Sequence, residues 1–369
     1  MSAASLSSSR SDHGSITTRE LQALGLTPGT VIDFSASTNP LGPSPSVWEA
    51  IQRVDLSRYP EDGSPALRSL LAQRCHLPES YILVTAGSNE AFWLLAFTSL
   101  TPLYPHARVV IATPTFGEYN RVSTLTRAAI MTCEASAARS YRCDLATLQD
   151  AIEANRPHLT FLCDPNNPTG DLVAPGVLRS TTLGMLARAA APGLLVVDES
   201  FALFADVPEE AEYIRAHENL VLVRSLTKTH GLAGLRIGFV IADPAVITTL
   251  QGAQMPWSVS SVAEAAALAA LADKDHWQRT YTTVKEGRAM LTIGLSKLGL
   301  PFLPSTVNYL LVRTGNARRT RARLLRYGCA VRDATSFGLP DYIRVGIRTP
   351  PECARLLGAL AQLQKEFMQ

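Results

Sequence analysis

The sequence lacks the cysteine patterns that would indicate a metal site or a disulfide framework. Its six cysteines stand at positions 75, 133, 143, 163, 329 and 353. They form no C-x-x-C pair and have no metal-ligand spacing with histidine. Because such scattered cysteines are typical of thiols in a reducing compartment, we expect no disulfide and no bound metal.

The sequence also lacks segments suited to a membrane, to export or to a nucleic acid. The Ala-rich stretch at 263–272 is too short to span a bilayer and contains Glu264. The polar start, MSAASLSSSRSD, has no apolar core of a signal peptide, so we interpret it as a disordered tail. The net charge is 34 − 32 = +2, and the arginines at 318, 319, 321 and 323 are interpreted as a solvated helix face. We therefore expect a soluble, cytoplasmic protein that binds no nucleic acid.

What is present is an ordinary globular balance with alternating strand and helix patterns. The chain has 369 residues, of which 46% are hydrophobic and 18% charged, a size that suits two domains. Runs rich in Val, Ile and Leu predict buried strands at 107–112, 160–163, 194–197, 219–224 and 237–242. Helical patterns, such as that at 177–190, lie between several of them. This alternation predicts an α/β fold with a mainly parallel sheet.

The pattern changes after the segment Gln-Met-Pro-Trp at 254–257. An Ala/Leu helix from about Val262, and more helix through Leu298, precede strand patterns at 308–313 and 342–346. Further helices are predicted at 318–327 and 351–367, the last with an apolar stripe. We predict an N-terminal arm at 1–30, a large domain at 31–255 and a smaller α+β domain at 256–369.

The strongest chemical signal is a lysine with two hydroxyls directly after a predicted strand. Residues 225–228 are Ser-Leu-Thr-Lys, and Arg236 follows within Gly-Leu-Arg-Ile-Gly. In α/β folds ligands bind at the carboxyl ends of strands. Hydroxyls and a guanidinium suit a phosphate, and a lysine amine kept neutral by burial and nearby cations forms an imine with an aldehyde. Pyridoxal phosphate presents both a phosphate and an aldehyde.

Three further motifs follow predicted strands or open a helix. Asp198, in Val-Val-Asp-Glu-Ser, could pair with a pyridinium nitrogen, although on its own it suits a helix N-cap equally well. The segment Asp-Pro-Asn-Asn-Pro-Thr-Gly at 164–170 is a turn by composition, and an amide there could reach a ring oxygen. Thr-Ala-Gly-Ser-Asn at 85–89 could hold phosphate on free helix N–H groups.

Together, in this order, these motifs resemble the fold-type I pyridoxal-phosphate enzymes, the aspartate-aminotransferase superfamily, from about Ile32 onward. The resemblance implies a three-layer α/β fold and pyridoxal 5'-phosphate as the cofactor. It makes Lys228 the Schiff-base lysine and Asp198 the partner of the pyridine nitrogen. The other cofactor residues that it implies are Gly87, Ser88, Asn89, Phe116 on the ring face, Asn167 at the ring oxygen, Ser225, Thr227 and Arg236. Tyr59 matches a tyrosine that reaches the neighbouring subunit's cofactor, which implies a homodimer.

Within the superfamily the chain is most similar to the histidinol-phosphate aminotransferase branch, and there to the threonine-phosphate decarboxylases of cobalamin biosynthesis. The stretches that carry this similarity are 13–14, 33–42, 254–259 and 308–311. The similarity implies substrate binding by His13, Gly14, Ser37, Asn167, Arg332 and Arg344, with the two arginines on the carboxylate and phosphate of one substrate. The expected reaction is decarboxylation of O-phospho-L-threonine to (R)-1-amino-2-propanol phosphate.

Departures from the pattern keep other substrates open. His13-Gly14 is followed by serine instead of a second glycine, and Ser37 stands where the decarboxylase has asparagine. The alternatives are an aminotransferase of the histidinol-phosphate type and a decarboxylase of a related phospho or phosphono amino acid. A cofactor-binding transcription regulator is disfavoured, because about 30 residues before Val31 leave little room for a DNA-binding domain.

Overall fold

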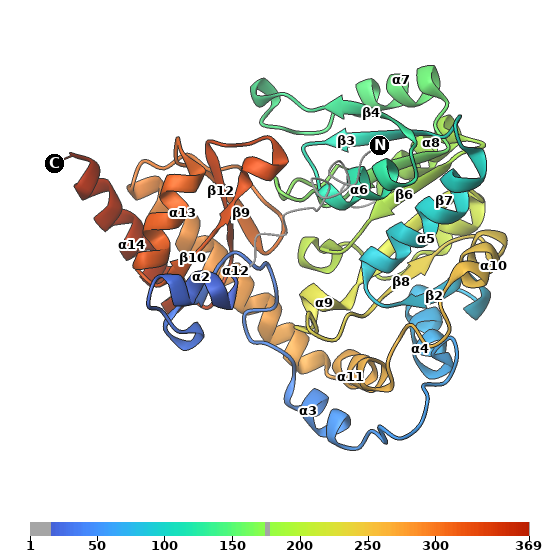
Figure 1. Ribbon diagram of the computed structural model, residues 1–369, viewed down its shortest axis with the longest axis horizontal. Coiled ribbons are helices and arrows are strands. Elements are labelled where there is room, and N and C mark those ends of the chain that lie inside the picture. The colour runs from blue at the N-terminus through green and yellow to red at the C-terminus, as the bar shows by residue number, and fades with distance from the viewer. Residues whose placement is uncertain (1–15, 174–177, 369) are drawn as a thin grey trace.

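A seven-stranded sheet forms the centre of the larger of two groups of elements in the computed structural model, which describes residues 16–173 and 178–368 (Figure 1). The strand order is β2-β8-β7-β6-β5-β3-β4. The bounds are β2 Ile82–Thr85, β3 Arg108–Thr113, β4 Ala129–Glu134, β5 Leu159–Cys163, β6 Leu194–Asp198, β7 Leu220–Ser225 and β8 Gly238–Ile241. Only β8 runs antiparallel to its neighbours β7 and β2. The predicted mainly parallel α/β sheet is confirmed.

Helices cover both faces of this sheet, which gives three layers. One face packs against α3 (Pro45–Gln52), α4 (Pro65–Cys75), α7 (Leu145–Asn155), α8 (Leu178–Ala190) and α11 (Ser261–Ala272). The other packs against α5 (Ser88–Leu100), α6 (Gly117–Leu125) and α10 (Pro244–Ala253). Strands β5 and β7 are buried along their whole length, as expected for central strands with apolar side chains on both faces. This is the predicted three-layer architecture.

The second group is a smaller α+β arrangement formed mainly by the C-terminal residues (Figure 1). An antiparallel sheet of order β11-β12-β9 contains β9 Tyr309–Arg313, β11 Arg332–Asp333 and β12 Tyr342–Gly346. It packs with α12 (Lys274–Lys297), α13 (Ala317–Arg326) and α14 (Pro350–Met368). From the N-terminal side, β1 (Ile32–Asp33) pairs in parallel with β10 (Cys329–Ala330), and α2 (Thr18–Ala23) buries Leu21 beside Leu325. The division into domains at 30 and 255 stays a prediction.

Short 3-10 helices complete the connections: η1 Pro28–Thr30, η2 Glu79–Tyr81, η3 Thr101–Leu103, η4 Ala137–Arg139, η5 Ala202–Ala205, η6 Glu212–Ala216 and η7 Ala334–Phe337. The helical region predicted from Val262 consists of two helices, because Asp273 caps the second by accepting a hydrogen bond from His276 N at 2.9 Å. Across 16–173 and 178–368, no helix combines the length and the hydropathy that crossing a membrane requires.

Candidate active site

The carboxyl ends of three neighbouring parallel strands bring the predicted motifs together. In the register of the sheet, Cys163 of β5 lies beside Asp198 of β6, and Asp198 lies beside Val223 of β7. The loop with Asn167 follows β5, and the single helical turn α9 (Leu226–Thr229) follows β7. Because parallel strands end at the same edge, residues distant in sequence share one site, as the ligand-binding rule for α/β sheets predicts.

A cradle for an anion lies at the N-terminus of α5. Gly87 precedes this helix with a φ of +82°, which favours glycine, and a Cβ atom built on it would lie 2.7 Å from Arg236 Nη2. Glycine at 238 likewise lets the backbone of β8 lie close to the start of α5, since a Cβ atom built on Gly238 would lie 3.1 Å from Ser88 N. The guanidinium and the unsatisfied N–H groups of a helix N-terminus therefore converge, which suits a phosphate. Asn89 lies half-buried in the first turn of the same helix.

Two hydroxyl side chains, Ser225 at the end of β7 and Thr227 of α9, lie next to each other just before Lys228. The Oγ atoms of Ser225 and Thr227 are 2.6 Å apart, and Ser225 Oγ caps α9 by accepting a hydrogen bond from Thr227 N at 3.3 Å. Both side chains are buried. The cap fixes the turn that carries Lys228, so the hydroxyl pair and the lysine have a set relation to each other.

Lys228 has the electrostatic surroundings of a reactive amine. Burial, together with the nearby charges of Arg344 and Arg236, lowers its pKa to about 8, whereas the charge of Asp198 opposes the shift. The backbone also holds the residue in place, because its carbonyl oxygen accepts a hydrogen bond from Asn39 N at 2.8 Å. A larger fraction of this amine is therefore neutral near pH 7 than for an exposed lysine.

Asp198 is a buried carboxylate with a hydrogen-bond donor on each oxygen. Tyr119 OH donates to Oδ2 at 2.5 Å, and Ser200 N donates to Oδ1 at 2.9 Å. Burial raises the pKa of Asp198, and the hydrogen bonds from Ser200 and Tyr119 oppose that rise. The alternative role as a simple helix N-cap does not fit, because the helical turn after it is η5 (Ala202–Ala205), whose first flanking residue is Phe201.

Asn167 and Arg344 meet on the side of the site that faces the smaller sheet. Arg344 Nη1 donates to Asn167 Oδ1 at 2.5 Å, and Nη2 donates to Ser35 O at 2.9 Å. With its oxygen engaged, the Asn167 amide nitrogen is left to donate to a ligand. Arg344 also lies over the ring of Tyr309 at 5.1 Å, and burial lowers its pKa to about 10.

Arg332 and Arg344 are direct cross-strand neighbours in the pairing of β11 with β12. Both are buried, and Arg332 donates from Nη2 to Ser336 Oγ at 2.6 Å. The Nε atom of Arg344 and the hydroxyl of Ser37 are buried without a hydrogen-bond partner within the described residues. Two adjacent guanidinium groups with an unused donor are suited to binding an anionic group of a substrate.

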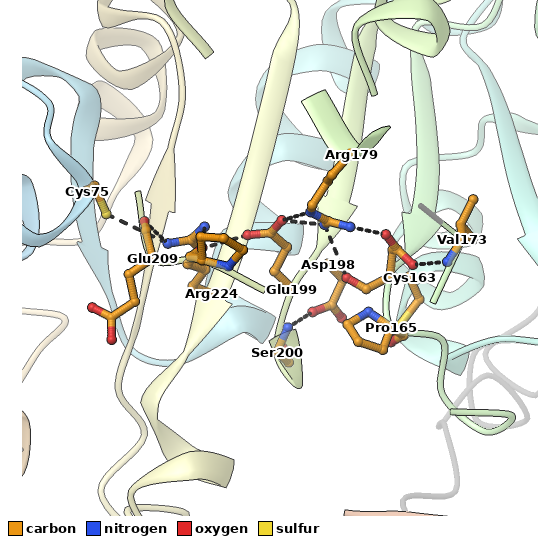
Figure 2. Close-up of polar contacts among 12 residues, drawn as sticks. Cys75, Cys163, Pro165, Val173, Arg179, Asp198, Glu199, Ser200, Glu209 and Arg224 are labelled. Carbon is orange, nitrogen blue, oxygen red and sulfur yellow. Dashed lines mark hydrogen bonds and ion pairs between the residues drawn. The ribbon is translucent and has the colours of Figure 1, made fainter. Parts of the chain in front are cut away.

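A buried network of charged residues joins the ends of β5, β6 and β7 (Figure 2). Arg179 of α8 pairs with both Asp164 and Glu199, and Arg224 Nε donates to Glu199 Oε2 at 2.7 Å. Burial alone would raise the pKa of Glu199, but Arg224 and Arg179 hold it below its usual range. Arg224 Nη1 also donates to Glu209 O at 2.6 Å. The network thus ties the ends of β5, β6 and β7 together.

Most of the predicted site residues that the structure describes lie in this region, but Tyr59 does not. Tyr59 is 78% exposed and stacks on Trp257, with ring centroids 4.5 Å apart, so it is not part of its own chain's pocket. His13 and Gly14 fall outside the described residues. Phe116 is half-buried just before α6, where its ring meets the edge of Tyr119 at 5.7 Å.

Several important residues were missed by the sequence analysis. Tyr119 could have been found from its place one helical turn after Phe116, and Glu199 from its place beside Asp198. Asn39 was noticed in a motif but given no role. Its Nδ2 donates to Thr229 O at 3.0 Å, so it fixes the lysine turn a second time. No sequence signal identifies Arg179 as the partner of Glu199 and Asp164.

The arrangement fits pyridoxal 5'-phosphate. The absence of a side chain at Gly87 lets the Arg236 guanidinium lie against the N-terminus of α5, since a Cβ atom there would collide with it. The guanidinium and the helix N–H groups together suit a phosphate. Lys228 offers an amine whose pKa is about 8, and Asp198 offers a buried carboxylate for a ring nitrogen. A cradle for an anion, an amine and a carboxylate on one sheet edge match the three polar parts of this cofactor.

Comparison with known proteins agrees with this fit. The sequence model of the family Aminotransferase class I and II matches residues 29–360. Histidinol-phosphate aminotransferases from Symbiobacterium thermophilum and Methylobacillus flagellatus are 37% and 35% identical to the chain. These alignments cover 89% and 93% of this chain, and 90% and 91% of the relatives. The crystal structure of histidinol-phosphate aminotransferase from Sinorhizobium meliloti in complex with pyridoxal-5'-phosphate has a TM-score of 0.83, 23% identity and 95% coverage of both chains. The predicted fold, superfamily and cofactor are confirmed.

The expected decarboxylase activity is wrong. Four relatives that are 32–37% identical over 89–93% of the chain carry the name histidinol-phosphate aminotransferase. L-threonine-O-3-phosphate decarboxylase from Porphyromonas gingivalis does share the fold, with a TM-score of 0.77 over 91% of this chain and 100% of its own. At 24% identity this likeness shows the fold alone. O-phospho-threonine as substrate and a role in cobalamin biosynthesis lose their support with it. Paired arginines did not distinguish the two activities, because both kinds of substrate carry anionic groups.

Proposed function

We propose that this chain, which belongs to the aminotransferase class I and II family and uses pyridoxal 5'-phosphate, transfers an amino group from a phosphate ester of the histidinol-phosphate type to a 2-oxo acid. The observation that carries the proposal is the 37% identity to a histidinol-phosphate aminotransferase over about nine-tenths of both chains. The buried pair Arg332 and Arg344 supports it, because both substrates of such a reaction are anions.

The proposed roles of the cofactor residues follow from their positions. When bound, the cofactor supplies an electron sink for negative charge at the substrate Cα. Arg236, the N-terminus of α5 and the two hydroxyls at 225 and 227 would hold the phosphate. Asp198 would hold the proton on the ring nitrogen, Asn167 would donate from its amide nitrogen to the ring oxygen, and Phe116 would pack on the ring face.

Lys228 would act as both the anchor and the base. Its amine would hold the cofactor covalently until the substrate amine displaces it. The freed Nζ atom would then act as a general base on the proton of the substrate Cα. This proton path is what distinguishes amino transfer from loss of carbon dioxide.

The substrate anions would be bound by Arg332 and Arg344, with Ser37 beside them. The phosphate ester and the 2-oxo acid would react one after the other, so the same guanidinium groups would serve each in turn. His13 and Gly14 are proposed to complete this part of the pocket.

A homodimer is part of the proposal. Leu56, Tyr59, Met255 and Trp257 are large apolar side chains that the isolated chain leaves between 49% and 80% exposed. We propose that a second copy covers them and that Tyr59 reaches the partner's cofactor phosphate. Light scattering should give the mass of a dimer, and a monomeric holoenzyme with full activity would contradict this part.

The reaction is tested with the purified holoenzyme, L-histidinol phosphate and 2-oxoglutarate, by measuring the glutamate formed. We expect turnover that needs both substrates, and a much lower kcat/KM for unphosphorylated histidinol. Arg344→Gln and Arg332→Gln should lower kcat/KM for the phosphate ester by about 10- to 100-fold, because each removes a charge-assisted contact. Arg313→Gln is the matched control, since Arg313 lies on the neighbouring strand β9 but is exposed. Holoenzyme that produces no glutamate from histidinol phosphate would refute the proposal.

A further inference from the structure

Tyr119 is a fully buried tyrosine whose hydroxyl points at the cofactor site. Its ring lies parallel to Phe161, with centroids 5.0 Å apart and 3° between the planes. Phe92 meets it edge-on at 5.0 Å, and Phe116 at 5.7 Å. Because aromatic rings confine it on several sides, the phenol cannot turn away, and the direction of its hydrogen bond to Asp198 is fixed.

The carboxylate of Asp198 still has room for a further donor. Tyr119 OH and Ser200 N occupy one lone-pair position on each oxygen, at 2.5 Å and 2.9 Å. A carboxylate has about four such positions, so two remain. Two donors on different oxygens define the plane of the carboxylate, whereas the Ser200 contact alone would leave its rotation less constrained. The remaining lone pairs therefore have defined directions.

We propose that Tyr119 is a positioning residue that fixes the carboxylate of Asp198 and sets how strongly it holds the ring nitrogen of the cofactor. The inference rests on the role proposed above for Asp198. It does not depend on which substrate the enzyme uses. Tyr119 itself contacts the carboxylate and is not assigned a contact with the cofactor.

The sign of the effect follows from which form of Asp198 accepts the hydrogen bond. A donor stabilises the ionised carboxylate, so the pKa of Asp198 is lower with Tyr119 than without it. Burial raises the pKa of Tyr119 well above its usual value, so the phenol remains a donor at neutral and acid pH. Removing the hydroxyl should therefore let Asp198 take up a proton at higher pH, and a neutral acid holds a protonated pyridine poorly.

The other titratable groups around Asp198 keep their charge in the relevant range. They are Cys163 of β5, Glu199 next in sequence, Lys228 of α9 and Tyr309 of β9. Burial raises the pKa of Cys163 and of Tyr309, and the pKa of Lys228 is about 8. Paired arginines keep that of Glu199 low despite its burial. Between pH 4.5 and 7 the protonation that the variant changes is that of Asp198.

The test is the dissociation constant of pyridoxal 5'-phosphate measured from pH 4.5 to 7.5 on the apoprotein of wild type and of Tyr119→Phe. The variant retains the ring and its packing. We expect the pH midpoint at which binding weakens to move up by about one pH unit, so that binding is about tenfold weaker below both midpoints and nearly unchanged at pH 7.5. No substrate is added, so failure of the proposed amino transfer would leave this measurement unaffected.

Tyr281→Phe is the matched control. Tyr281 of α12 also donates to a carboxylate, Asp206 Oδ2 after η5, at 2.6 Å, but this hydrogen bond is exposed. Its removal should leave the midpoint unchanged. A purely structural role for Tyr119 would lower the melting temperature of the variant without moving the midpoint, and that result overturns the proposal.

A double-mutant cycle tests whether Tyr119 acts through Asp198. In an Asp198→Asn background the side chain no longer titrates, so adding Tyr119→Phe should not change the pH profile of binding. If the second substitution still shifts the profile in that background, Tyr119 acts by another route and the proposal fails. The cycle remains informative even when both single variants bind the cofactor weakly.

Discussion

Substitution of Glu199 by glutamine should destabilise the protein strongly although Glu199 is not assigned a contact with the cofactor. Its carboxylate is buried between Arg179 and Arg224, and both of its oxygens take part in these ion pairs. Removing one partner of a buried ion pair costs about 3–5 kcal/mol, because the remaining charge is left without compensation. Here two guanidinium groups lose their shared partner, although Asp164 still pairs with Arg179.

The expected change in melting temperature follows from the size of the chain. At roughly 2.1 cal/mol/K per residue, 369 residues have an entropy of unfolding of about 0.8 kcal/mol/K. A loss of about 3–5 kcal/mol then lowers the Tm by about 4–6 °C. Differential scanning fluorimetry of the apoprotein measures this shift directly.

The control is Glu49→Gln, in the ion pair of Glu49 on α3 with Arg53 directly after the helix. The two groups are 3.7 Å apart, and their side chains are 68% and 80% exposed. Exposed pairs contribute about 0–1 kcal/mol, so the Tm should change by about 1 °C or less. If Glu199→Gln melts within 1 °C of wild type while the control behaves as expected, the network does not stabilise the strand ends and the reasoning is refuted.

Three further predictions concern the cofactor. Lys228→Ala should abolish covalent retention, so borohydride treatment followed by mass spectrometry should find no labelled peptide; a label elsewhere would contradict the assignment. Cofactor uptake by apoprotein should speed up as pH rises from 6, reach half its maximum near pH 8 and level off above about pH 9, because the neutral amine reacts and its pKa is about 8; Arg344→Gln should move this curve to higher pH in stopped-flow absorbance. Gly87→Ala should weaken cofactor binding by about tenfold or more, because its Cβ would lie 2.7 Å from Arg236 Nη2 at a φ of +82°, whereas Gly234→Ala, with open space around it, should not.

The sequence predicted best those features that neighbouring residues determine. Strand β12 was predicted with its observed bounds, and β6 within one residue, because each is a short apolar run bounded by clear breaks. The residues that end β6 and β7 were identified for the same reason, since a polar residue directly after a buried strand is visible in the sequence. Strand β4 was missed because it lies at the sheet edge and most of its side chains are at least partly exposed.

Long-range partners could not be predicted in the same way. Tyr119 and Asp198 are 79 residues apart, and Arg344 and Asn167 are 177 apart. Nothing in either local sequence specifies the other, and only the folded sheet brings them together. The choice between amino transfer and decarboxylation failed for a related reason, because Arg332 and Arg344 suit either class of anionic substrate, and the few side chains that decide between them act through geometry.

The short parallel pair of β1 with β10 has a consequence for any attempt to divide the protein. Phe34 N donates to Ala330 O, and Gly346 N donates to Phe34 O, each at 2.7 Å, so a segment near the start of the chain is built into the C-terminal half. A fragment beginning at residue 256 would leave the hydrogen-bonding edge of β10 bare and the apolar surface around Leu325 uncovered. Such a fragment should aggregate when expressed alone, and split versions of this enzyme would need to carry residues 16–36 along with it.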